Sequence, residues 1–312
     1  MRTKVRCLAM TRALYTGESY LQAQQAIEAQ PAGSPPIPAP ARAQLNLEAR
    51  FFEQILDARG EITSHPLGIQ AVRPLADALH LRVDGETTAL QLLRYILPRW
   101  ETPVGDVHGV PGLRVHRRHN HAIELRQVGS LASVRLTGLP ARWWKFAEAE
   151  LLSEADTTDV LAWRDSPTAW TPREMRWDSE YYEGSSEYAK RWQRQTWLAS
   201  GLLRRIALLH TVAACHAADG WKGLSCMPHR WCFDLAHTRD RPPRLAELAA
   251  ALRDPVFGLD LILVEQEDLY GFVPANEPIV LTAPVADRGE VEFRVLSFAA
   301  GSFDTVPVVG QW

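Results

Sequence analysis

The chain has 312 residues, of which 46% are hydrophobic and 23% are charged, and its formal net charge at pH 7 is −3. These proportions are those of a globular protein, and they exclude a mainly disordered, collagen-like or coiled-coil chain. The small negative net charge gives no overall attraction to nucleic acid or to an anionic membrane, so either activity would need a local basic face. The best candidate for a membrane span, Ile206–Cys215, has about half of the roughly twenty residues required. We therefore expect no membrane segment.

Cysteine and arginine usage indicates a cellular compartment. Four cysteines, Cys7, Cys215, Cys226 and Cys232, are too few for a disulfide scaffold and are typical of a reducing compartment. The first ten residues are basic at the start but have no continuous apolar run, so we expect no secretory signal. Arginine outnumbers lysine 30 to 4, a bias that we attribute to high-GC coding. Together these features predict a cytoplasmic protein of a bacterium.

The N-terminal residues 3–29 are expected to form two short helices. Gly17 would end the first helix, and Ser19 would cap the second. The segment Leu14–Ala23, with the sequence LYTGESYLQA, resembles the opening helix pair of uncharacterised actinobacterial proteins. The resemblance is confined to residues 3–29, implies no chemistry and transfers no functional residue.

A proline-rich stretch separates this hairpin from the rest of the chain. Five prolines between residues 31 and 40 lie among alanine, glycine and serine, which is typical of an extended linker. We therefore expect a helical hairpin at 1–29, a linker at 30–44 and a body at 45–312, with a subdivision of the body near residue 185 as an alternative.

The body is expected to mix helices with antiparallel strands, which makes the fold class α+β. The helices are expected at 45–56, around 72–79, from about 86 to 97, at 142–152, at 157–163, after the capping box Thr171–Glu174, and at 187–217. Strands are expected where apolar and polar residues alternate, at 113–117, 122–126, 132–136, 259–264, 279–281, 291–298 and 306–309. His116, His119 and His121 would lie near a positively charged turn between the first two strands.

Charge is distributed along the chain in blocks. Residues 110–145 have a net charge of +6, residues 146–188 of −8, and residues 189–253 of +7. Such blocks usually neutralise one another within one fold, and that is the simplest interpretation. The alternative is an outward basic face.

The helix expected at 187–217 tests this alternative. At 100° per residue, five cations and a tryptophan share an arc of about 140° opposite an apolar stripe. This arc contains Lys190, Arg191, Arg194, Trp197, Arg204 and Arg205. Cations on one face can neutralise phosphates while an indole stacks on an unpaired base. The strand residues Arg117 and Arg118 would extend this nucleic-acid-binding surface.

Cysteine and histidine also cluster, at Cys215, Cys226, His229, Cys232 and His237. Zinc prefers four such ligands at tetrahedral corners, but no clean pair of cysteines two residues apart is present. We expect these residues to belong to the core and favour no cofactor, with zinc as the alternative.

The sequence leaves three functional hypotheses open and does not decide whether the protein is an enzyme. It contains no nucleophile elbow, no phosphate-binding loop, no dinucleotide fingerprint and no zinc-protease motif. The leading hypothesis is a non-enzymatic accessory protein that binds nucleic acid through its basic helix and strand segment. The alternatives are a scaffold whose N-terminal hairpin binds a protein partner, and a metal-dependent hydrolase that uses the cysteine and histidine cluster.

Overall fold

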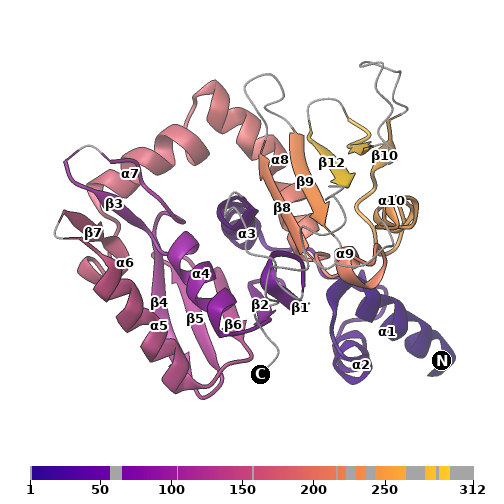
Figure 1. Ribbon diagram of the computed structural model, residues 1–312. Helices are drawn as coiled ribbons and strands as arrows, with labels where there is room; N and C mark the ends of the chain where they lie inside the picture. Colours follow the sequence, from indigo (N-terminus) through magenta and orange to yellow (C-terminus); the bar gives the residue numbers. More distant parts are fainter. Residues whose placement is uncertain are drawn as a thin grey trace, which may run out of the picture. The chain divides into compact units, whose positions relative to one another are not determined.

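The computed structural model confirms an α+β fold, with the predicted helix pair at its N-terminus (Figure 1). It describes residues 2–56, 65–103, 105–156, 158–215, 217–222, 230–236, 243–264, 278–285 and 288–295. The chain forms two compact units, each assembled from separate stretches of sequence. Unit 1 consists of Met1–Ala39, Arg59–Arg73 and Arg204–Trp312, and unit 2 consists of Pro40–Ala58 and Pro74–Leu203. Within the described part of the chain, no helix combines the length and the hydrophobicity that crossing a bilayer requires.

Unit 1 begins with α1 (Arg2–Thr16) and α2 (Tyr20–Glu28). Gly17 has a φ of 70°, and a Cβ atom on it would lie 2.5 Å from the backbone oxygen of Gln70, so only glycine fits this turn. The Ser19 side chain accepts a hydrogen bond from the backbone of Gln22, whose own side chain completes a capping box. The turn chemistry read from the sequence is confirmed.

Two buried arginines hold the proline-rich stretch within unit 1. Arg12, which is 1% exposed, pairs with Glu18 and donates to the carbonyl oxygen of Pro36. Arg204 donates to the carbonyl oxygen of Pro38 over 2.6 Å. Ile37 lies between these two acceptors and is itself buried. The stretch forms no helix or strand, yet side chains from distant parts of the sequence bind its backbone.

The remainder of unit 1 contains a sheet with the strand order β10-β11-β12-β9-β8. Its strands are β8 (Ala217–Lys222), β9 (Arg230–Ala236), β10 (Ile262–Leu263), β11 (Ile279–Thr282) and β12 (Glu290–Val295). Strands β9 and β12 are parallel, and the other neighbours are antiparallel. The other elements of the unit are η1 (Pro66–Gly68), β1 (Ile69–Pro74), α9 (Leu208–Thr211) and α10 (Leu245–Leu252). The sequence did not predict β8, β9 or α10, and the strand expected at 306–309 lies outside the described residues.

Unit 2 contains the three antiparallel strands that the sequence predicted. Its helices are α3 (Arg42–Leu56), α4 (Glu86–Ile96), α5 (Ala141–Glu154), α6 (Ala162–Asp165), α7 (Pro172–Asp178), the π-helix η2 (Ser179–Glu183) and α8 (Glu187–Leu203). Its strands are β2 (Ala78–Val83), β3 (Arg99–Glu101), β4 (Leu113–His119), β5 (Ala122–Gln127), β6 (Ser133–Thr137) and β7 (Asp159–Leu161). Strands β2, β6, β5 and β4 are neighbours in that order, with β2 and β6 parallel, while β3 and β7 pair separately.

Two of the predicted helices are wrong. The segment expected to be helical around 72–79 instead ends β1 and begins β2, where buried Leu79, Leu81 and Val83 alternate with more exposed residues. This alternation has the strand period of two, whereas the prediction matched only a few apolar positions to the helical period. The segment 157–163 forms β7 and the start of α6.

One face of the unit 2 sheet is apolar and packs beneath helices. Leu81, Leu136 and Ile123 are register neighbours on this face, and so are Leu79, Val134 and Leu125; all of these side chains are buried. Helix α5 contacts β4 and β5 on this side, since Glu148 of α5 pairs with Arg118, the register partner of Ile123. Helix α4, which packs against α5, lies in front of the strands in Figure 1.

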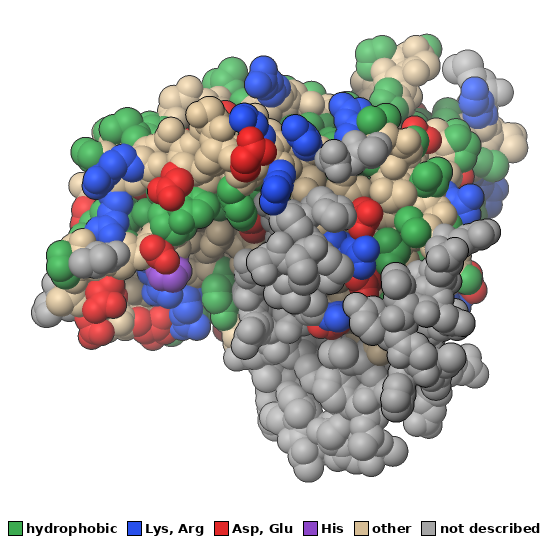
Figure 2. Space-filling model, turned by 90° about the horizontal axis from the view of Figure 1, so that it is seen from above, with side chains coloured by type: hydrophobic (Ala, Val, Ile, Leu, Met, Phe, Trp, Pro, Cys, Tyr) green, Lys and Arg blue, Asp and Glu red, His purple; other side chains and the backbone are tan. Residues whose placement is uncertain are grey.

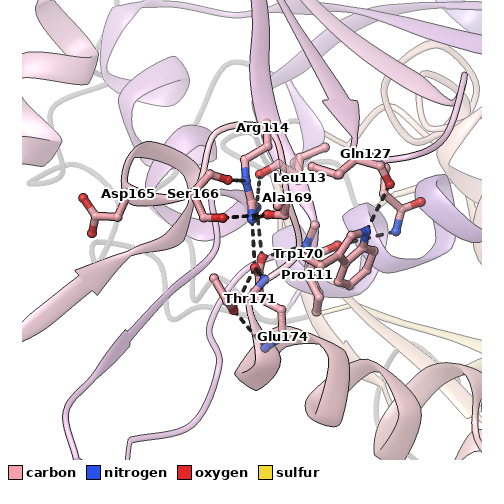
Figure 3. A network of polar contacts seen from close by, with 12 residues as sticks. Pro111, Leu113, Arg114, Gln127, Asp165, Ser166, Ala169, Trp170, Thr171 and Glu174 are labelled. Carbon is pink, nitrogen blue, oxygen red and sulfur yellow. Dashed lines mark hydrogen bonds and ion pairs between the residues drawn. The ribbon is translucent and has the colours of Figure 1, made fainter.

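A buried ion pair joins β4 to α7 (Figure 3). Arg114 donates to both carboxylate oxygens of Glu174 over 2.8 and 2.9 Å, and the side chain of Glu174 is 0% exposed. Glu174 also forms the predicted capping box with Thr171 and accepts from the backbone of Gly112. Gly112 has a φ of 75°, and a Cβ atom there would lie 2.4 Å from Trp170. Loop, strand and helix are thus held by one carboxylate.

We predict that Arg114→Met destabilises the protein by about 3–5 kcal/mol, because it leaves the buried carboxylate of Glu174 without its cation. The free energy of unfolding in urea measures this. Arg176→Met on the exposed side of α7 is the matched control and should change stability by less than about 0.5 kcal/mol. Equal effects of the two substitutions would contradict the role given to Arg114.

Candidate functional site

The predicted basic helix is shorter than the sequence indicated. Helix α8 ends at Leu203, and residues 204–207 form a turn, so the expected extension to residue 217 is wrong. No glycine or proline follows Leu203 to mark this end. Arg204 and Arg205 therefore do not continue the helical face.

Both of these arginines bind backbone oxygens within unit 1. Arg204 is 1% exposed and donates to Pro38, as described above. Arg205 donates from Nε to the carbonyl oxygen of Phe257 over 2.6 Å. Burial, together with the nearby charge of Arg204, lowers the pKa of Arg205 to about 10. These two cations stabilise the fold, and they are not part of an outward face.

The rest of the predicted helical face lies on α8 in unit 2. Lys190, Arg191 and Arg194 are exposed, and Trp197 is half-buried. Figure 2 looks onto the side on which α8 lies in Figure 1, and it shows Lys and Arg side chains near the middle of this side with acidic side chains beside them. Lys190 forms an ion pair of 3.0 Å with Glu187 and lowers the pKa of that carboxyl group. Its charge is therefore partly neutralised.

A larger group of cations lies on the second face of the unit 2 sheet, opposite α5. The strand registers place Arg135 of β6 beside Glu124 of β5, and Glu124 beside Arg117 of β4. Residues two apart on a strand share a face, so the same side carries the remaining members of the group. We call this group the basic sheet face: His80, Arg82, Arg117, His119, Glu124, Arg126 and Arg135.

The two strand arginines predicted from the sequence point to opposite faces. Arg117 is exposed on the basic sheet face. Arg118 lies on the apolar side, where it donates to both carboxylate oxygens of Glu148, and this hydrogen bonding raises its pKa. A β-bulge between Val115 and Arg117 sets this alternation. Arg118 is thus committed to an ion pair with α5.

Glu124 is the carboxylate that the described strands themselves contribute to the basic sheet face. It accepts from Arg126 over 2.8 Å and lies 3.2 Å from Nε2 of His119. Its partial burial acts to raise the pKa, but the hydrogen bonds from His119 and Arg126 outweigh this effect and lower it. The Nε donors of Arg126 and Arg135 are buried and have no acceptor among the described residues. Arg114, the register partner of Arg126, lies on the same side and pairs with Glu174, so among the described residues the other four arginines face Glu124 and leave a net positive charge.

The sequence analysis missed Arg82, Arg126 and Arg135. The signal that could have identified them is the alternation of apolar and polar residues along each strand. In Ala-Leu-His-Leu-Arg-Val and Ser-Val-Arg-Leu-Thr, the arginine occupies one of the polar positions, which share one face of the strand. The misassigned helix around 72–79 concealed β2, and the pairing of separate strands cannot be read from local spacing.

The structure describes only part of the cysteine and histidine cluster. Cys215 and Cys232 are buried in unit 1, whereas Cys226, His229 and His237 lie outside the described residues. Burial, and then the charge of Glu292, raise the pKa of Cys232 to about 11, which keeps this thiol protonated at neutral pH. No group of three metal-ligating side chains occurs among the described residues.

A second polar cluster is buried between α3, η2 and α8. The Arg50 guanidinium lies 2.8 Å from Glu183 and 2.9 Å from Asp178, and it packs over the ring of Tyr182 at 5.0 Å. Burial raises the pKa of Asp178 to about 6, and the carboxylates of Glu183 and Glu174 add to this effect while Arg50 opposes it. Burial and neighbouring carboxylates account for this shift, as they do in structural ion-pair clusters.

Comparisons with known proteins contribute no assignment. No protein-family model matches the chain, and neither the curated proteins nor the solved structures contain a match.

We predict that Asp178→Asn increases stability at neutral pH more than at acid pH. The pKa of Asp178 is raised from 3.8 to about 6 in the folded protein, so the folded state binds the proton more tightly than the unfolded state. The contribution of Asp178 to the free energy of unfolding therefore falls as the pH rises from 3.8 to about 6. Above pH 6 the ionised group costs about 2–3 kcal/mol. Urea unfolding at pH 4.5 and 7.5 measures the difference, with exposed Asp106→Asn as control. An equal effect of Asp178→Asn at both pH values would refute this assignment.

Proposed function

We propose that unit 2 binds nucleic acid through the basic sheet face. The observation that carries this proposal is the alignment of Arg82, Arg135, Arg126 and Arg117 on one side of four neighbouring strands, with Glu124 as the carboxylate that these strands contribute. Four strands about 4.8 Å apart spread these guanidinium groups over about 14 Å, a width suited to several backbone phosphates.

The chemistry of the face favours phosphate contacts over base recognition. Guanidinium groups bind phosphate oxygens with two parallel hydrogen bonds, and Arg82 and Arg117 are the exposed members of the face that could do so. The described residues of the face include no tryptophan, tyrosine or phenylalanine on which a base could stack. The binding would therefore be independent of sequence and strongly dependent on salt. The α8 cations Lys190, Arg191 and Arg194 would add a weaker, general attraction.

The proposal includes the cellular setting expected from the sequence. Cys7 and Cys232 form no disulfide bond, which fits a reducing bacterial cytoplasm. A role as a non-enzymatic accessory protein fits a surface on which cations outnumber carboxylates.

A specific observation also favours the protein-partner hypothesis for unit 1. The helix pair exposes four large apolar or aromatic side chains, Met10 (54%), Leu14 (48%), Tyr20 (39%) and Leu21 (68%). Exposed apolar clusters often mark protein interfaces. This second candidate is compatible with nucleic-acid binding by unit 2, because it uses other residues.

We predict that the wild-type protein binds a labelled 20-base-pair duplex with a log K against log salt slope of about −3.6, as expected for four phosphate contacts. Arg82→Glu with Arg117→Glu should weaken binding and reduce the slope by at least about 1.8, because two cations are lost. Both residues are exposed, so circular dichroism should show an unchanged fold. Fluorescence anisotropy from 50 to 200 mM salt measures the affinities.

The matched control is Arg142→Glu with Lys145→Glu on α5, which packs on the opposite face of the same sheet. Both double variants change the net charge of the protein by the same amount, so a difference in affinity between them reports where the cations lie. An equal loss of affinity in both double variants, or no binding by the wild-type protein at 50 mM salt, would rule out the basic sheet face as the site. Leu14→Ser with Leu21→Ser should leave duplex binding unchanged.

A further inference from the structure

Three aromatic side chains form a row where α7, η2 and α8 follow one another in unit 2. The ring centroids of Trp177 and Tyr181 are 4.2 Å apart, and those of Tyr181 and Tyr188 are 5.5 Å apart with the rings nearly perpendicular. Tyr188 is 45% exposed, and Trp177 and Tyr181 are half-buried. The row therefore presents aromatic surface to the outside.

A buried layer beneath the row fixes the position of its rings. Tyr182 and Trp192 are 4% and 1% exposed and pack edge to face with centroids 4.8 Å apart. Glu53 of α3 accepts a hydrogen bond from Nε1 of Trp192 over 3.1 Å and one from the hydroxyl of Tyr188 over 3.4 Å. A surface that is held in place in this way loses little conformational entropy when it binds a ligand.

Carboxylates lie beside the row, and cations of the protein already pair with two of them. Residues 177–189 contain Asp178, Glu180, Glu183 and Glu187, with Arg176 before this stretch and Lys190 after it. Glu183 pairs with Arg50 and Glu187 with Lys190. Partial burial, together with the charges of Glu180 and Asp106, raises the pKa of Tyr181. We call this surface the acidic aromatic platform, made of Trp177, Tyr181 and Tyr188 with Glu180, Glu183 and Glu187. Glu180 is the carboxylate of the platform that favours an external cation.

The protein already uses this chemistry for one of its own arginines. Beneath the platform, the guanidinium of Arg50 packs at 5.0 Å over Tyr182 and at 5.9 Å over Trp192, and it pairs with Glu183 at 2.8 Å. Aromatic faces with adjacent carboxylates thus hold a guanidinium on the inner side of the same segment.

We propose that the acidic aromatic platform binds an arginine side chain from an extended segment of a partner protein. The guanidinium would stack on the half-buried ring of Tyr181, beside Tyr188, and pair with Glu180. Arginine fits this surface better than lysine, because its planar, weakly hydrated group stacks on a ring while its edge donates to a carboxylate. This interaction is independent of nucleic-acid binding, which uses cations on the sheet.

The test is isothermal titration calorimetry of the full-length protein with three blocked peptides, GRGRG, GKGKG and GEGEG. We expect GRGRG to bind, GKGKG to bind at least about 3-fold more weakly, and GEGEG not to bind. Tyr181→Ala should weaken GRGRG binding by about 2- to 5-fold, since one exposed cation–π contact is lost. Glu180→Gln should weaken it by about 2- to 5-fold and reduce its salt dependence.

Two further variants keep the result interpretable. Tyr181→Leu preserves apolar bulk without the aromatic face, so wild-type affinity in this variant would overturn the stacking role. Arg82→Glu with Arg117→Glu should leave peptide binding unchanged, which separates this proposal from that of the basic sheet face. Equal binding of GRGRG and GKGKG, or no heat from GRGRG at millimolar peptide with a folded protein, would overturn the proposal.

Discussion

Unit 2 depends on the ion pair between Arg114 and Glu174. Arg114 lies at the start of β4, and Glu174 lies in the first turn of α7, 60 residues later in the chain. The same carboxylate caps α7 and binds the backbone of Gly112. Since α7 leads directly into η2 and α8, this contact sets where the aromatic row begins relative to the sheet. The basic sheet face and the acidic aromatic platform are therefore positioned by the same buried ion pair.

The sequence left two interpretations of the charge blocks open, mutual neutralisation and an outward basic face, and the structure combines both. The +6 block at 110–145 and the −8 block at 146–188 do neutralise each other in part, through the pairs of Arg114 with Glu174 and Arg118 with Glu148. Arg117, Arg126 and Arg135 are left on the basic sheet face, with Glu124 as the carboxylate that the described strands contribute there. Asp178, Glu180 and Glu183 of the acidic block lie within the segment that carries the aromatic row. Partial neutralisation thus produces two residual fields of opposite sign.

Local chemistry was readable from the sequence wherever it depends on neighbouring residues. The Gly17 turn, the Ser19 and Thr171 capping boxes and the strands β4, β5 and β6 are all confirmed, because each is encoded within a few positions, although a bulge in β4 breaks the expected alternation there. The end of α8 was not readable, since no helix-stop residue marks it and Arg204 instead binds a carbonyl 166 positions earlier. The basic sheet face needed the order of four strands, which depends on contacts far apart in sequence.

Arginine usage in this protein has a structural reason beyond the base composition that the sequence indicated. Arg114 uses three nitrogens to bind the carbonyl oxygens of Leu113, Ser166 and Ala169 as well as both oxygens of Glu174. A lysine has three donors on a single nitrogen, so it could not reach acceptors on both sides of the carboxylate. Arg12 and Arg204 similarly bind backbone carbonyls while almost fully buried. Buried guanidinium groups thus connect distant segments, and the same planar donor geometry, where it remains exposed on the sheet, suits the oxygens of phosphate.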